Sequence, residues 1–207
     1  MKVSSLGGMK LKMSRPYTID QDWSREIQLL AIQQIYPKVW PDCQILELDD
    51  DRLNLLKQTL DVGGADKLLR YSDKTVAFLA QRFRTYEESL EYDDFTLRFT
   101  RPYSKATTEC EKVLRSLAQN RLLASFYSYG HVNKEKNGFL RFRILKFKEF
   151  LEAWRDRKIP PPIGPIPNPD GTTFLAWSFA KIPKELIFWE LKSKKNLTDF
   201  LEGDLNG

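Results

Sequence analysis

The chain has very little cysteine and histidine. Its 207 residues include two cysteines, Cys43 and Cys110, and one histidine, His131. Two isolated cysteines match no metal-ligand spacing and build no disulfide framework, so we expect a reducing, cytoplasmic environment. One histidine cannot supply a multi-histidine metal centre. The chain therefore has too few histidine and cysteine ligands for a zinc enzyme.

Long apolar runs and nucleotide-binding glycine patterns are also missing. No stretch approaches the roughly 20 apolar residues of a membrane helix, so we expect no membrane partner. Gly63-Gly64 lacks the spacing of a dinucleotide-binding motif and is followed by no Gly-Lys-Ser. These absences exclude P-loop nucleotide hydrolases and nicotinamide-dependent enzymes of the usual kind.

Aromatic residues are plentiful, with thirteen Phe, eight Tyr and five Trp in a chain that is 42% hydrophobic. A chain of this length and composition can bury a large core. Residues 159–170 contain six prolines and predict an extended connection. We therefore expect a flexible leader over 1–19, a core over 20–158, and a Pro-rich extension over 159–207 that packs on the core.

Charge is unevenly distributed along the chain. Residues 42–97 contain thirteen acidic and seven basic side chains, whereas residues 98–158 contain fifteen basic and six acidic ones. The net charge of +5 favours a polyanionic partner. Acidic groups that hold a cation beside basic groups that hold phosphates are what a metal-dependent phosphodiester enzyme needs. Two ordinary solvated faces would give the same pattern.

Hydrophobic periodicity and turn residues predict alternating helices and strands. A first helix is expected over 21–36, capped by Asp20 or Asp22 and stopped by Pro37. Thr108 and Glu111 form a capping-box pattern in a second helix over 105–119. A third helix is expected over 148–157, and 49–60 and 185–192 stay ambiguous. Strands are expected over 44–48, 67–71, 75–84, 94–101, 122–129, 139–147 and 172–180.

The strands over 67–71 and 75–84 are expected to form a hairpin around Ser72-Asp73-Lys74. A turn centred near Asp73 places Asp66 across from Ala80 and Gln81, within cross-strand contact distance. Because side chains alternate along a strand, Gln81 and Phe83 share one face, and Arg82 and Arg84 share the other. We expect 94–101 to be the third strand of this antiparallel group.

This order, with an Asp at one hairpin strand and a polar residue on the next, resembles the PD-(D/E)XK nuclease superfamily. The resemblance spans roughly 20–147 and rests on short motifs. It implies an α/β fold with a mixed central β-sheet flanked by helices, a restriction-endonuclease-like core. It also implies a Mg²⁺ or Mn²⁺ site built by Asp66, Gln81 and Glu26. Gln81 stands where most members carry a carboxylate, and Phe83 where they carry Lys.

Basic side chains are expected to bind DNA around that site. Lys112 or Arg84 could supply the missing catalytic cation. The candidates for contacting nucleic acid lie on strands and on the second helix: Arg82, Arg84, Lys105, Arg115, Arg141 and Arg143. The sequence thus predicts a DNA-binding, Mg²⁺-dependent nuclease. Alternatives are a catalytically inactive DNA-binding protein or an assembly protein on the same fold, and a homodimer stays open.

Overall fold

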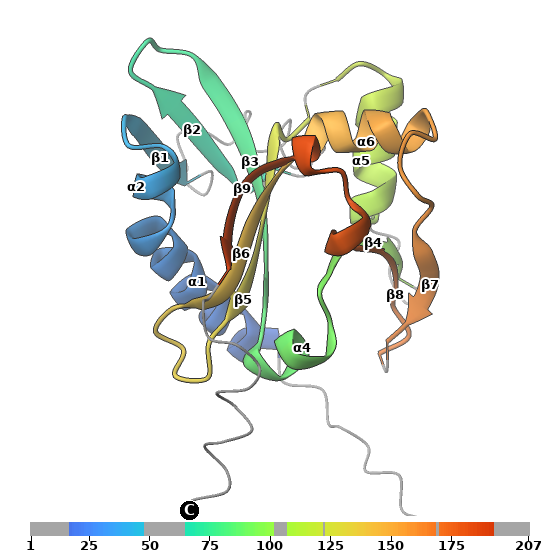
Figure 1. The fold of residues 1–207 in the computed structure, drawn as a ribbon, viewed down its shortest axis with the longest axis horizontal. Helices are drawn as coiled ribbons and strands as arrows, with labels where there is room; N and C mark the ends of the chain where they lie inside the picture. Colours follow the sequence, from blue (N-terminus) through green and yellow to red (C-terminus); the bar gives the residue numbers. More distant parts are fainter. Residues whose placement is uncertain (1–16, 48–64, 102–106, 122, 169, 193–207) are drawn as a thin grey trace, which may run out of the picture.

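The computed structural model describes residues 17–47, 65–101, 107–121, 123–168 and 170–192. They form a six-stranded mixed sheet in the order β1-β2-β3-β5-β6-β9, and a second sheet in the order β4-β8-β7. Helices α1 and α2 cover one face of the central sheet, and α5, α6 and the second sheet lie on the other (Figure 1). The expected α/β fold with a helix-flanked mixed sheet is confirmed.

The first helix begins earlier and ends differently than the sequence predicts. Helix α1 spans Tyr17–Gln34, so Asp20 and Asp22 lie within it instead of capping it, and part of the expected leader is helical. Pro37 does not stop the helical segment. It lies in the first turn of the short helix α2, Tyr36–Val39, where a missing N–H costs little.

The hairpin forms in the expected register. Strand β2 is Lys67–Tyr71 and strand β3 is Val76–Arg84, and Lys67 pairs with Leu79. Strand β1, Cys43–Glu47, pairs antiparallel with β2 and is the outer strand of this group. The segment 49–60, left ambiguous by its pattern, lies outside the described residues.

The prediction that 94–101 joins the hairpin is wrong. Strand β4, Asp94–Thr100, pairs with β8, Thr173–Ser178, in the second sheet. The free edge of β3 is taken by β5, Phe126–Val132, which runs parallel to it. A parallel pair needs a long crossover, and the chain between β3 and β5 supplies it with α4, β4 and α5.

Three short helices follow β3 in the described part of the chain, and capping motifs begin two of them. Helix α4, Tyr86–Glu91, was not predicted and begins with a capping box between Thr85 and Glu88. The predicted capping box of Thr108 and Glu111 begins helix α5, Glu109–Ala118. Helix α6, Phe147–Arg155, has no side-chain cap and follows β6, Phe139–Lys146, directly.

The C-terminal segment belongs to both sheets. Within the Pro-rich connection, β7, Ile163–Pro167, pairs with β8 as an exposed edge strand. Two 3₁₀ turns, η2 at Phe179–Lys181 and η3 at Lys184–Leu186, lead to β9, Ile187–Lys192, which pairs with β6. The ambiguous segment 185–192 is therefore largely strand, and it completes an edge of the central sheet.

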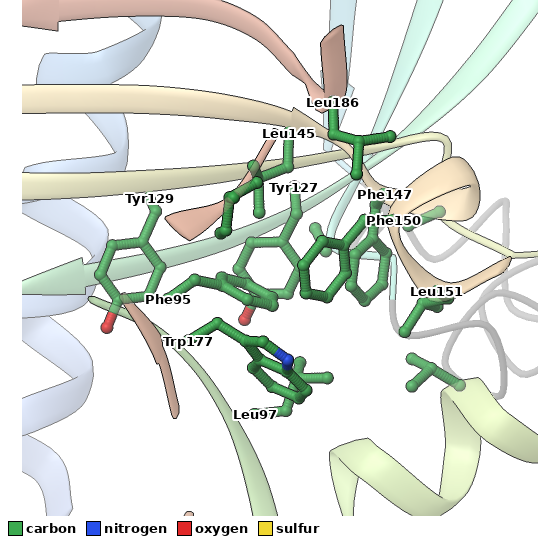
Figure 2. Close-up of a cluster of buried hydrophobic side chains, with 14 of the residues drawn as sticks. Phe95, Leu97, Tyr127, Tyr129, Leu145, Phe147, Phe150, Leu151, Trp177 and Leu186 are labelled. Carbon is green, nitrogen blue, oxygen red and sulfur yellow. The ribbon is translucent and has the colours of Figure 1, made fainter. Parts of the chain in front are cut away.

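An aromatic core joins the two sheets. Phe95 of β4 lies at its centre, with ring centroids of Tyr127 at 5.0 Å and Phe150 at 5.2 Å, both edge-on (Figure 2). Trp177 of β8 closes the far side, 5.3 Å from Phe150. Edge-to-face rings bury large apolar areas with favourable geometry. This core holds β4 against the central sheet and so positions the polar groups described next.

No helix in the described part of the chain is both long and apolar enough to cross a membrane.

Candidate functional site

Strand β3 sends alternate side chains to opposite faces of the central sheet. Leu79 packs in the cluster beneath α1 and α2, whereas Phe78 and Ala80 pack in the aromatic core. We call these the α1 face and the α5 face. Arg82 and Arg84 contact partners from β4 and β5 on the α5 face, as the alternation predicts.

Asp66 lies just before β2 and is bound to the backbone of β3. Its N–H donates to the Leu79 carbonyl at 2.9 Å, and its Oδ2 accepts from the Gln81 N–H at 2.7 Å. The register continues to a pairing of Asp66 with Ala80, a residue of the α5 face. The Asp66 side chain is exposed, so a cation that prefers oxygen ligands can reach its carboxylate from solvent.

Gln81 does not meet Asp66 with its side chain. Its Oε1 accepts from the Tyr36 hydroxyl at 2.7 Å, and that hydroxyl lies 2.9 Å from the Ser128 Oγ. Tyr36 is buried under the α1 face, so the Gln81 amide points to the side opposite Ala80. Only the Gln81 backbone contacts the Asp66 carboxylate, because a one-residue step along a strand reverses the face.

Phe83, at the position where the resemblance expects Lys, packs on the α1 face against Phe139 and Phe142. The absence of a Cβ at Gly130 makes this packing possible, since an added Cβ would lie 2.8 Å from Phe83 Cδ1. Phe83 is therefore part of the packing and supplies no cation at this point of β3.

The remaining predicted residues are scattered. Glu26 is exposed on α1, and Arg115 is exposed in the last turn of α5. Lys112 is half-buried on α5. Lys105 lies outside the described residues.

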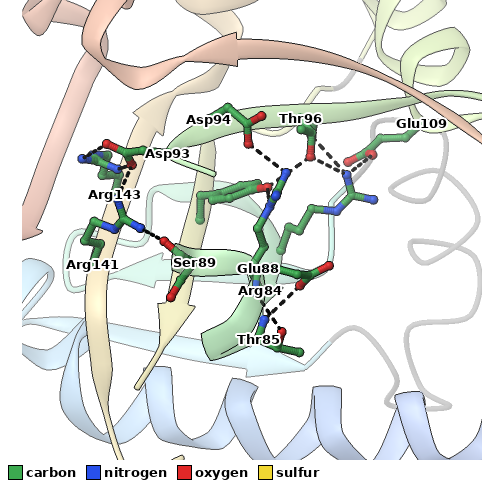
Figure 3. A network of polar contacts seen from close by, with 12 residues as sticks. Arg84, Thr85, Glu88, Ser89, Asp93, Asp94, Thr96, Glu109, Arg141 and Arg143 are labelled. Carbon is green, nitrogen blue, oxygen red and sulfur yellow. Dashed lines mark hydrogen bonds and ion pairs between the residues drawn. The ribbon is translucent and has the colours of Figure 1, made fainter. Parts of the chain in front are cut away.

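The arginines Arg84, Arg141 and Arg143 are bound within the protein. Arg84 pairs with Asp94 at 2.8 Å and donates to the Tyr129 hydroxyl at 2.5 Å. Arg143 pairs with Asp93 at 2.5 Å, while Arg141 pairs with Asp93 and donates to the Ser89 carbonyl (Figure 3). The Arg143 side chain is 5% exposed and also pairs with Glu190.

This network pairs Asp93 of the acidic half with Arg141 and Arg143 of the basic half, and it pairs Arg84 with Asp94 within the acidic half. The acids come from the acidic half or the C-terminal strand, and the arginines from β3 and β6. Buried charges need such partners, because an unpaired one would carry the full desolvation cost. The charge segregation seen along the chain is therefore partly neutralised by folding.

The α5 face holds a second polar group around Arg82, and sequence reasoning missed its acidic member, Glu109. Glu109 is the first residue of α5, and its Oε2 lies 3.7 Å from Arg82 Nη1. Its Oε1 accepts from the Tyr127 hydroxyl at 2.5 Å, and its Oε2 from the Arg98 N–H at 3.1 Å. Arg82 also donates to the Thr96 Oγ1 at 3.1 Å.

The charge of Asp66 acts on two buried phenols, Tyr127 on the α5 face and Tyr36 on the α1 face. The pKa of the Tyr127 phenol is raised far above its usual value, first by burial, then by the charge of Glu109, with a smaller contribution from Asp66. Burial lowers the pKa of Arg82, but Glu109 and neighbouring groups outweigh it and raise that pKa overall. The Glu109 carboxylate thus contacts Tyr127, and the charges of Arg82 and Asp66 act on it as well.

A metal that needs a complete protein cage would find none among the described residues. Among the described residues, no three His, Cys, Asp or Glu side chains gather as a metal-binding group. Mg²⁺ keeps several waters and commonly takes only one or two carboxylates plus phosphate oxygens. Each Glu109 oxygen accepts one hydrogen bond, and Oε2 also faces the Arg82 guanidinium.

No family model matches the chain, and neither the curated proteins nor the solved structures include one similar to it.

Proposed function

We propose that the protein binds DNA and hydrolyses its phosphodiester bonds with Mg²⁺ or Mn²⁺ at Asp66, Glu109 and Arg82. The observation that carries this proposal is the Glu109–Arg82 pair beside Tyr127 on the α5 face, the face to which the hairpin register assigns Asp66. The topology also supports it: helices α1 and α2 precede three antiparallel strands, β1 to β3, and a crossover of α4, β4 and α5 leads to β5, parallel to β3. A restriction-endonuclease-like core has such a mixed, helix-flanked sheet.

The roles of the residues differ from those expected from the sequence. Asp66 and Glu109 would hold the cation, which when bound lowers the pKa of a coordinated water and polarises a phosphoryl oxygen. Arg82 would neutralise negative charge on the phosphate, since a guanidinium presents donors in a fork that matches its oxygens. Gln81 instead orders the Tyr36–Ser128 group behind the strand.

Cleavage assays on single-stranded, duplex and branched DNA with Mg²⁺ or Mn²⁺ test this proposal. We expect Asp66→Ala and Glu109→Gln each to lower the rate by at least about 100-fold, because even outer-shell changes cost about 10- to 100-fold. Asp42→Ala, which removes an exposed aspartate elsewhere on the chain, should retain the wild-type rate. A wild-type protein that leaves every substrate intact with both ions would refute catalysis.

A second candidate is DNA binding without turnover. It is favoured by the direction of the Gln81 side chain, which withholds a predicted ligand from the Asp66 carboxylate. Binding through arginine and lysine would weaken steeply with salt, because neutralised phosphates release counterions. A salt-dependent DNA affinity that is the same with Mg²⁺ and with a chelator, without cleavage, would select this candidate.

A further inference from the structure

Two arginines beside the proposed site have no acidic partner among the described residues. Arg98 lies on β4, and Arg101 follows that strand directly. Each of Arg82, Arg84, Arg141 and Arg143 forms an ion pair, whereas no described acidic group lies within ion-pair distance of Arg98 or Arg101. The Nε atoms of both are buried and lack a hydrogen-bond partner in the described part of the chain.

Phe174 of β8 brings two of these cations together. It pairs with Arg98 across the second sheet, and the Arg98 Cζ lies 5.7 Å from its ring centroid. The Arg82 Cζ, from the central sheet, lies 5.0 Å from the same centroid. An aromatic face attracts a guanidinium, so Phe174 can hold both near one point.

This arrangement disfavours the charge on Arg98. Burial lowers the pKa of Arg98 first, and the charges of Arg82 and Arg101 lower it further, against partial compensation from Glu109 and Asp170. Buried arginine donors without a hydrogen-bond partner are costly, and several arginines with too few acidic partners repel one another. Such a group is expected where a bound anion accepts the hydrogen bonds and balances the charge. The side chains of Arg82 and Glu109 are 20% and 24% exposed, so the group is reachable from solvent.

We infer that Arg98 and Arg82 form a phosphate-binding subsite at Phe174, beside the α5-face carboxylates, and that the charge of Arg101, three residues after Arg98, adds to it. A phosphate group supplies negative charge and several acceptor oxygens, which match forked guanidinium donors. The inference concerns binding of phosphate and requires no cleavage. In DNA the phosphate is either a backbone phosphodiester or a terminal monophosphate.

Calorimetric titration with inorganic phosphate, against sodium chloride of equal ionic strength, tests the subsite directly. We expect Arg98→Gln to weaken phosphate binding at least tenfold, and Arg101→Gln to weaken it less. Arg155→Gln, which removes an arginine that is 53% exposed and paired with Asp156, should leave the affinity unchanged. Undetectable phosphate binding by the wild type, or equal affinity in all four proteins, would overturn the inference.

Thermal unfolding in phosphate-free buffer shows whether the variants fold. We expect the melting temperature of Arg98→Gln to equal or exceed that of the wild type, because the substitution removes a charge that its neighbours repel. A melting temperature raised by phosphate in the wild type and unmoved by it in Arg98→Gln supports the subsite. A phosphate-induced rise that persists in Arg98→Gln contradicts it.

Oligonucleotides with and without a 5′-phosphate distinguish the source of the phosphate. If the subsite holds a terminal monophosphate, the phosphorylated strand binds more tightly and Arg98→Gln removes the difference. If it holds a backbone phosphodiester, Arg98→Gln weakens both strands equally. Phosphate binding by a wild-type protein that neither binds nor cleaves DNA would keep the subsite and refute the proposed function.

Discussion

His131 should make the protein lose stability in mild acid. Its side chain is fully buried on β5, and neither ring nitrogen has a hydrogen-bond partner among the described residues. Burial, together with the charges of Arg141, Arg84 and Arg143, lowers the pKa of His131 to about 3, although Asp93 opposes the shift. The three arginines come from β3 and β6, the strands on either side of β5, and Asp93 comes from the segment before β4.

The magnitude follows from proton linkage. In the unfolded chain the imidazole titrates near 6.5, so as pH falls the unfolded state binds a proton before the folded state does. The contribution of His131 to the free energy of unfolding is fully present above pH 6.5 and declines as the pH falls toward 3. Between pH 7 and pH 5 the free energy of unfolding should fall by about 2 kcal/mol from His131 alone.

Urea denaturation of the wild type and of His131→Phe at several pH values between 7 and 5 measures this contribution. His131 is the chain's single histidine, so no other imidazole titrates in this window. The substitution breaks no hydrogen bond to a described residue, and Phe keeps a planar ring at the site. We expect the variant to lack the decline of about 2 kcal/mol. An equal decline in both proteins, or none in the wild type, would refute the reasoning.

Two further predictions concern the frame that holds the site. Gly130→Ala should lower the free energy of unfolding by about 1–3 kcal/mol, because the new methyl group would lie within 3.0 Å of three aromatic rings. Gly138→Ala, whose new methyl group meets nothing closer than 3.6 Å, is the matched control for chemical denaturation and should change little. Thr108→Ala should lower the free energy of unfolding by about 1 kcal/mol, because it removes the side-chain cap of α5. Thr107→Ala, one residue earlier, is the control and should not lower it. An equal loss of stability in both variants would rule out the cap as the cause.

Several features of this fold were predictable because their signals act over short distances. The hairpin register around Asp73, the capping box at Thr108, and the opposite faces of Gln81 and Arg82 depend only on turn chemistry, helix ends and strand alternation. The same alternation separates Gln81 from Ala80, the residue that pairs with Asp66. Strand alternation alone therefore places the Gln81 side chain outside a metal site on the α5 face.

The partners of distant segments were decided only by tertiary structure. Nothing local in 94–101 indicates that its partner is Thr173–Ser178, because strand pairing across that distance depends on which edges are free and which faces must be buried. The approach of Glu109 to Arg82, and of Arg98 to Phe174, follows from that pairing. The sequence thus determined the chemical groups and their faces, and the packing of the second sheet on the first decided which of them meet.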